Sequence, residues 1–153
     1  MTPLTATAQP LPQATPHASG PALLTELTAA HAALLERIAE LGAITGQAAA
    51  PRLEYSAARM RLSQASIDRR TVLNRTLRHL SEQADDATAL VLARVREADG
   101  ELIAHSVKHL ATWTAESISA DWRGYCEASR EMRDHMARTV HAEAELLKPL
   151  LAR

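Results

Sequence analysis

The sequence contains no phenylalanine, one cysteine and five glycines, and aromatic residues make up only 3% of it. Without phenylalanine, a hydrophobic core has to be built from leucine, alanine, isoleucine, valine and methionine. The single cysteine, Cys126, excludes a disulfide within these residues and is typical of a protein from a reducing compartment. We therefore expect a core of aliphatic side chains and a cytoplasmic location.

The sequence also lacks a strong net charge and long apolar runs. The net charge of -1 gives no bias toward nucleic acid or anionic membranes. No apolar run approaches the roughly 18 residues of a membrane span. The first Lys or Arg is Arg37, so we expect neither a secretory signal with a basic start nor an Arg-rich transit peptide. These absences predict a cytoplasmic protein whose partner is neither a membrane nor nucleic acid.

Common enzyme motifs are absent as well. There is no strand-like alternation, glycine-rich phosphate loop, ordered Ser/His/Asp set or CxxC pair. We therefore do not expect an enzyme.

Hydrophobic residues make up 46% of the chain, which is enough for one core. Residues 1–20 are rich in Pro, Thr and Ala without periodicity and are expected to be a disordered tail. Residues 21–153 show four amphipathic segments joined by short connections, over about 21–46, 52–82, 86–115 and 119–151. This pattern predicts an all-α domain, an antiparallel up-down-up-down four-helix bundle.

Apolar residues repeat at spacings of three and four on one face of each segment. The inward faces are expected to contain Leu24, Leu27, Leu34, Ile38 and Leu41 in the first segment, Tyr55, Ala58, Leu62, Ala65, Leu73, Thr76 and Leu80 in the second, Val91, Val95, Ala98, Leu102, His109 and Trp113 in the third, and Met132, Met136, Val140, Leu147 and Leu150 in the fourth.

Three ionisable residues fall within these apolar faces. Glu143 needs a proton, a cation or a hydrogen-bond partner if it is buried. Arg69 cannot lose its proton and therefore needs an acceptor. His31 is either a core histidine satisfied by one hydrogen bond or a metal ligand. The environment of Glu143 is therefore the main clue to function.

The other histidines are weaker candidates. His105 and His109 form an i, i+4 pair that could chelate a metal on a surface, but no third ligand lies at a matching height, which favours an incidental pair. His135 lies at the edge of its apolar stripe, and His141 and Glu145 lie on the opposite face of the last segment. The arginines of the second segment suggest weak RNA or anion binding, but the neutral chain and scarce aromatics favour a solvated face balanced by acidic neighbours.

The end of the chain, with Glu143, Leu146, Leu147 and Pro149 before Leu150-Leu151, resembles the hemerythrin-like (HHE cation-binding) domain family. That family is a four-helix bundle with a non-haem di-iron centre. Its second and fourth helices each carry a His, a Glu four residues on, two apolar residues at seven and eight, and often a Pro at ten. Its first and third helices each supply a further His. The resemblance covers residues 22–151 and includes His31 in the first helix.

The departures from this family pattern are substantial. The resemblance places Ala65, Thr88 and Thr139 where the family has histidines, and Arg69 where it has the second glutamate. Only His31 and Glu143 remain as candidate metal ligands, and two ligands are too few for a stable site. We expect a degenerate metal site in which Arg69 replaces the cation and pairs with Glu143, with His31 and Thr139 supplying hydrogen bonds.

Four functions follow as hypotheses. The first is a bundle that has lost its di-iron site, has no cofactor, and acts as a small regulatory or interaction module through a protein partner or self-association. The alternative keeps non-haem iron for oxygen or iron sensing or storage, with His31 and Glu143 joined by waters, His135 or His141. A di-iron oxidase or peroxidase needs the full ligand set and is least favoured. Anion or RNA binding by the arginines is the fourth.

Overall fold

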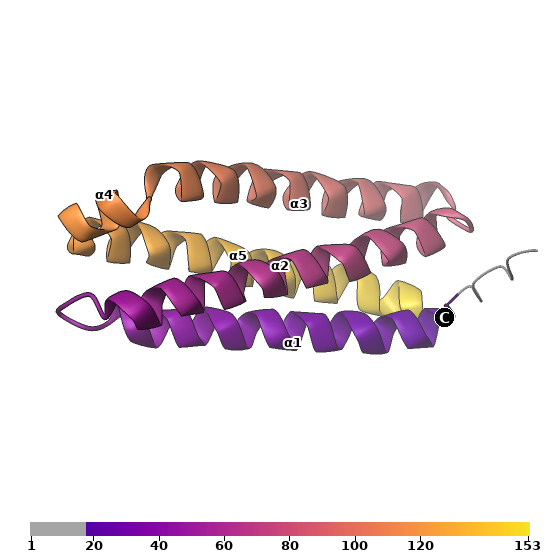
Figure 1. The fold of residues 1–153 in the computed structure, drawn as a ribbon. Helices are drawn as coiled ribbons and strands as arrows, with labels where there is room; N and C mark the ends of the chain where they lie inside the picture. The colour runs from indigo at the N-terminus through magenta and orange to yellow at the C-terminus, as the bar shows by residue number, and fades with distance from the viewer. Residues whose placement is uncertain (1–17) are drawn as a thin grey trace, which may run out of the picture.

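A computed structural model describes residues 18–153, so residues 1–17 of the expected tail lie outside the described part of the chain. The described residues form helices and no strand, which confirms the all-α class. None of these helices is both long and apolar enough to cross a membrane. The helices are α1 (Gly20–Thr45), α2 (Arg52–Ser81), α3 (Asp86–Thr112), α4 (Ala115–Ala120) and α5 (Trp122–Leu151) (Figure 1).

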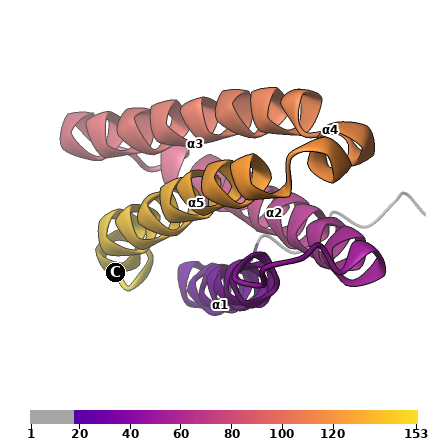
Figure 2. The same ribbon diagram turned by 90° about the vertical axis from the view of Figure 1, so that its left-hand side faces the viewer.

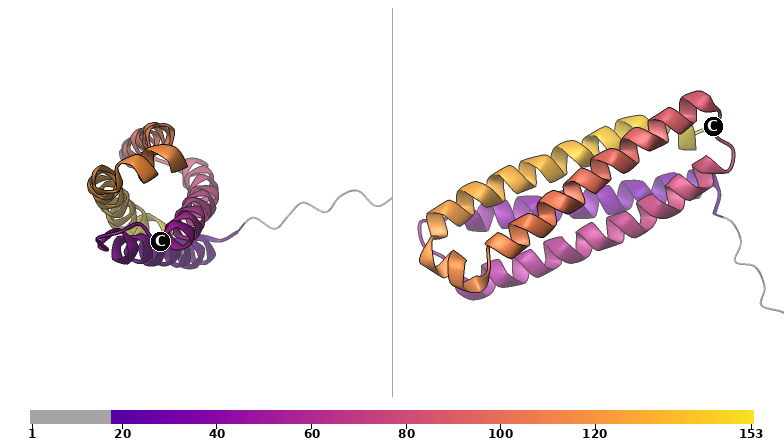
Figure 3. Two further views of the ribbon diagram at one scale, coloured as in Figure 1. Left: turned by 60° about the vertical axis from the view of Figure 1, so that its left-hand side comes forward. Right: turned by 90° about the horizontal axis from the view of Figure 1, so that it is seen from above.

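The four long helices lie side by side, and consecutive ones run in opposite directions (Figure 1). Seen nearly along their axes, they surround a common interior, while the short α4 turns the chain from α3 into α5 at one end (Figure 3). α1 packs against α2 and α5, and α5 also packs against α3 (Figure 2). Of the four neighbouring pairs of long helices, α2 and α3 pack against each other least extensively.

Side-chain caps set several helix starts. The Ser19 side chain accepts a hydrogen bond from the Ala22 amide at the start of α1, and Asp85 accepts one from Thr88 at the start of α3. Both caps lie where the sequence predicts a helix start.

The start of the last helix differs from the prediction. The sequence predicts segments over about 86–115 and 119–151, but the third helix ends at Thr112, and α5 begins at Trp122 after the separate short helix α4. Asp121 caps α5 by accepting a hydrogen bond from the Gly124 amide at 2.8 Å. A Cβ at Gly124 would lie only 2.2 Å from Asp121 Oδ2, so the glycine makes room for this cap.

The core consists of two large apolar clusters at different heights, each built from all four long helices. The first cluster contains Leu23, Leu27, Leu73, Leu77, Leu92, Val95, Leu147 and Leu151. The second contains Leu34, Leu41, Ala58, Leu62, Leu102, Met132, Met136 and Val140. A smaller aromatic cluster of Tyr55, Ile118 and Tyr125, with Trp113 and Trp122 packed against it, fills the end near α4.

The predicted inward face of α3 is displaced by one residue in two places. Leu92 and Asp99 are buried, whereas Val91 and Ala98 were expected to be. Val91 and Ala98, like Leu92 and Asp99, lie three or four residues from Val95, so spacing alone does not distinguish the two faces. The face with Val91 and Ala98 was expected to be buried because it contains no aspartate. The displacement matters because it adds a carboxylate to the interior.

Candidate functional site: an ionic cluster between two core clusters

One ionisable residue from each long helix lies between the two large core clusters. In α1, for example, Leu27 belongs to the first cluster and Leu34 to the second, and the ionisable residue lies between them. Each of the four is at most 8% exposed. This ionic cluster consists of His31 of α1, Arg69 of α2, Asp99 of α3 and Glu143 of α5.

The carboxylate of Glu143 has both oxygens engaged. Arg69 Nη1 donates to Glu143 Oε1, and His31 Nε2 lies 3.0 Å from Glu143 Oε2. Arg69 Nη2 donates to Asp99 Oδ1 at 2.5 Å. Arg69 and Glu143 are each only 1% exposed. The guanidinium therefore bridges two carboxylates from different helices in a nearly dry interior.

The guanidinium of Arg69 remains charged in this position. Burial acts to lower its pKa, but the charge of Glu143 and the hydrogen bonds to Glu143 and Asp99 raise it by more. The pKa of Arg69 consequently lies above its ordinary value. A permanent positive charge thus sits in the middle of the molecule, as a metal cation would in a carboxylate-lined site.

The expected contacts of Arg69 and His31 with Glu143 are present, but the expected role of Thr139 is wrong. Thr139 is buried, and its hydroxyl donates to the His135 carbonyl one turn earlier, at 3.0 Å. A threonine within a helix readily bonds the carbonyl four residues before it, and this local bond takes its only donor.

Asp99 is the member of the cluster that the sequence analysis missed. Two signals point to it. Leu92, Val95, Asp99 and Leu102 continue the spacing of three, four and three in α3. In addition, a guanidinium carries five N–H donors, which is more than one carboxylate can accept, so a buried Arg69 demanded a second acceptor.

The positions where the resemblance expects histidines do not surround one site. Ala65 lies one turn before Arg69 and packs against the second core cluster. Thr88 lies in the first turn of α3, where its amide donates to Asp85. Thr88 is eleven residues from Asp99, which is about 16 Å along a helix axis. The residue of α3 at the height of the ionic cluster is therefore Asp99, and the expected alignment of Thr88 with the site is wrong.

The residues present do not fit the di-iron centre that the resemblance implies. Such a centre needs a set of His and carboxylate donors facing a shared cation. Here the donors face a guanidinium, and both oxygens of Glu143 are engaged by Arg69 and His31. Within residues 18–153, no three His, Cys, Asp or Glu side chains are placed to hold a metal ion together.

The other histidines that the sequence analysis considered as ligands lie away from the ionic cluster. His105 of α3 contacts His135 of α5 through their Nδ1 atoms, 2.8 Å apart, so one nitrogen donates and the other accepts. His109 instead lies near the ring of Tyr125, with 6.1 Å between ring centres. His141 and Glu145 are both exposed on the outer face of α5. His105 therefore pairs with His135 of the neighbouring helix, and not with His109 of its own helix.

Acid is expected to destabilise the protein through these histidines. Burial, then the charges of Arg59 and His105, lower the pKa of His109 to about 4, and burial and His105 also lower that of His135. An unfolded histidine has a pKa of about 6.5, so the unfolded chain binds more protons and stability falls as pH drops from about 6.5 toward 4. Because His109 is only partly buried, we expect it to account for a loss of about 1–2 kcal/mol.

Urea unfolding at pH 7.5, 6 and 5 checks this expectation. His109→Gln should have a shallower dependence of unfolding free energy on pH than the original chain, whereas His141→Gln, at an exposed position, should keep the original slope. Equal slopes for all three proteins would contradict the assignment.

The ionic cluster forms one continuous set of hydrogen bonds from His31 through Glu143 and Arg69 to Asp99, and so joins all four long helices. Its one guanidinium is already paired with two carboxylates. Comparison with protein-family models, curated proteins and solved structures found no match for this chain.

Proposed function

We propose that this chain is a hemerythrin-like four-helix bundle whose Arg69–Glu143 pair replaces the di-iron centre, and that it acts as a small cytoplasmic regulatory or interaction module. The observation that carries the proposal is the guanidinium of Arg69 held between Glu143 and Asp99. It supplies the positive charge that buried carboxylates require, without a metal.

The ionic cluster suits a rigid scaffold better than a reactive site. Its hydrogen bonds are directional and come from one residue on each long helix, so they favour a single relative height of the four helices. Buried ionic groups of this kind need not add stability, but they can specify one arrangement among several of similar energy. A module of fixed shape is what partner recognition requires.

An exposed apolar stripe on α2 supports a role in binding a partner. Leu53, Met60 and Ile67 recur at intervals of seven and are 88%, 74% and 52% exposed. A seven-residue spacing keeps side chains on nearly the same side of a helix. Successive members lie about 10 Å apart along the helix axis, the spacing at which a partner helix lying along α2 meets one side chain every two turns. The stripe is suited to a helix of a partner protein or of a second copy of the chain.

Metal analysis of protein purified without a histidine tag tests the loss of the metal site. We expect substoichiometric iron, manganese and zinc, and no oxo-bridged di-iron absorption band, even after growth with added iron. Two equivalents of iron per chain would contradict the proposal and restore the oxygen- or iron-binding alternative. Glu143→Gln is the matched control, because iron that is bound through Glu143 would be lost in this variant.

A further inference from the structure

A second polar site lies away from the ionic cluster, in a cavity of about 180 Å³ between α2, α3 and α5. Of the neighbouring pairs of long helices, α2 and α3 pack least extensively. The apolar wall of the cavity includes Leu41, Leu62, Met132 and Met136. The volume equals that of about six water molecules in the liquid, at about 30 Å³ each. The cavity therefore has room for a small organic molecule.

Three arginines line this cavity without an acidic partner. Arg59, Arg70 and Arg133 belong to its wall, which contains no Asp or Glu, and none of the three forms an ion pair within the described residues. Arg59 Nη2 donates to the Trp113 carbonyl at 2.9 Å and Arg133 Nη2 to Thr45 Oγ1 at 3.0 Å, and both acceptors are neutral. Residues 1–17 contain no Asp or Glu that could supply the missing charge.

Two buried polar groups in the cavity wall make no hydrogen bond of ordinary geometry among the described residues, namely Tyr125 Oη and Arg70 Nε. The group nearest to the Tyr125 hydroxyl in role is the Ser129 hydroxyl, one turn further along α5 and also in the cavity wall. Tyr125 is 0% exposed. Burial raises the pKa of its hydroxyl, which therefore stays protonated and is able to donate. Unpartnered buried donors of this kind are rare in native proteins and call for an acceptor.

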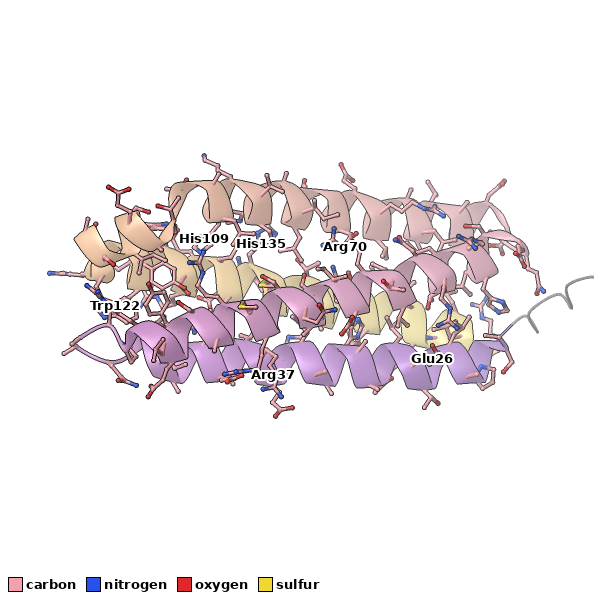
Figure 4. The ribbon with its side chains drawn as sticks, viewed as in Figure 1. Glu26, Arg37, Arg70, His109, Trp122 and His135 are labelled. Atoms are coloured by element: carbon pink, nitrogen blue, oxygen red, sulfur yellow. The ribbon has the colours of Figure 1, made fainter. Side chains whose placement is uncertain are left out.

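Arg59, His109 and Tyr125 form the α4 end of the cavity. The guanidinium carbon of Arg59 lies 5.5 Å from the centre of the Tyr125 ring. Arg133 lies eight residues after Tyr125 on α5, on the same wall. His109 also lines this end, and its lowered pKa leaves it uncharged at neutral pH. Figure 4 shows Arg70 and His109 between the ribbons of α2 and α3, with Arg70 farther from the α4 end.

We propose that this cavity binds a small aliphatic carboxylate. Its carboxylate group accepts hydrogen bonds from Tyr125 Oη and is held by the charges of Arg59 and Arg133, and its hydrocarbon chain lies against Leu62, Met132 and Met136. A carboxylate with a hydrocarbon chain fits better than a bare inorganic anion because apolar side chains line the rest of the cavity beside Ser63, Ser66, Ser106 and Arg70. These apolar side chains are Leu41, Leu62, Ile67, Leu110, Met132 and Met136. The proposal does not depend on the function proposed for the ionic cluster.

Binding of octanoate, dissolved as a monomer, to the full chain tests the proposal by isothermal titration calorimetry. Octanoate should bind, whereas 1-octanol, which lacks the charge, and inorganic phosphate, which lacks the hydrocarbon, should bind at least about ten-fold more weakly. Tyr125→Phe removes only the hydroxyl and should weaken octanoate binding by about ten-fold, as should Arg133→Gln.

Arg78→Met, an exposed arginine on α2, is the matched control and should leave octanoate binding unchanged. Circular dichroism establishes that each variant keeps its helices. The proposal is overturned if octanoate does not bind, if octanol or phosphate binds equally well, or if folded Tyr125→Phe and Arg133→Gln bind octanoate as the original chain does.

Discussion

Replacing Arg69 with methionine should lower the free energy of unfolding by about 3–5 kcal/mol, the cost typical of breaking a buried ion pair. Methionine retains much of the apolar stem but removes the cation between Glu143 and Asp99. Because Glu143 is 1% exposed, water cannot replace the lost partner without opening the core. Urea unfolding monitored by circular dichroism, with the slope on urea concentration held constant, measures the loss.

The matched control for this change is Arg78→Met on the same helix. Arg78 is exposed and forms no ion pair within the described residues, so its replacement should change stability by no more than about 0.5 kcal/mol. If Arg69→Met is as mild as Arg78→Met, the two carboxylates do not depend on the guanidinium, and its role as a substitute for a metal is wrong.

The second large effect is expected for Glu143→Gln, which preserves shape but removes the charge. The amide oxygen of glutamine can still accept from Arg69, and its NH₂ can face His31 once Nε2 of the neutral ring is the acceptor, but the negative charge that the guanidinium faces is lost. We expect a loss of at least about 3 kcal/mol, since a buried guanidinium is left with Asp99 alone. Thermal unfolding and urea unfolding should agree on this loss.

Glu145→Gln is the control for this second change, because Glu145 lies two residues later on the exposed face of α5. It should be nearly neutral. A mild or stabilising effect of Glu143→Gln would mean that the carboxyl group is already uncharged in the folded protein, in which case Arg69 and Glu143 do not form an ion pair.

The helices were predictable because spacings of three and four, together with capping residues such as Ser19 and Asp85, act locally along the chain. The start of α5 was not predictable, because Ser117, Ser119 and Asp121 all precede it and all are of residue types that cap helices. Asp121 is the cap in the structure, because its carboxylate accepts a hydrogen bond from the Gly124 amide and Gly124 has no Cβ to exclude that carboxylate. Competition among caps is decided by geometry that a sequence pattern does not contain.

The interior pair was predictable for a different reason. Arg69 and Glu143 each lie at the centre of an apolar face, and a buried charge needs a partner of opposite charge, so an ion pair between them was the expected arrangement. Asp99 was missed because an aspartate in α3 can equally face solvent, and only the burial of Leu92 fixes the rotation of that helix. The need of Arg69 for a second acceptor was the sequence signal that should have identified it.

The arginines of α2 divide in a way that the sequence alone does not reveal. Arg61 pairs with Glu40 and Arg75 with Glu26, so this part of the helix is balanced by acidic residues of α1, as expected. Arg59 and Arg70 instead line the cavity toward α3. Which arginines face α1 and which face the cavity depends on how α2 packs between α1 and α3. That packing is a property of the assembled helices and cannot be read from either segment alone.

The most direct test of the central claim is the coupling free energy between Arg69 and Glu143, measured with Arg69→Met, Glu143→Leu and the double variant. The double variant should lose far less stability than the two single losses combined, by about 2 kcal/mol or more, because an apolar replacement of a whole buried pair is often neutral. Asp99 also loses its partner, Arg69, in the double variant. Adding Asp99→Asn to the double variant should therefore recover more of the free energy of unfolding. Simple additivity of the two single losses would mean that Arg69 and Glu143 do not interact, and would contradict the account.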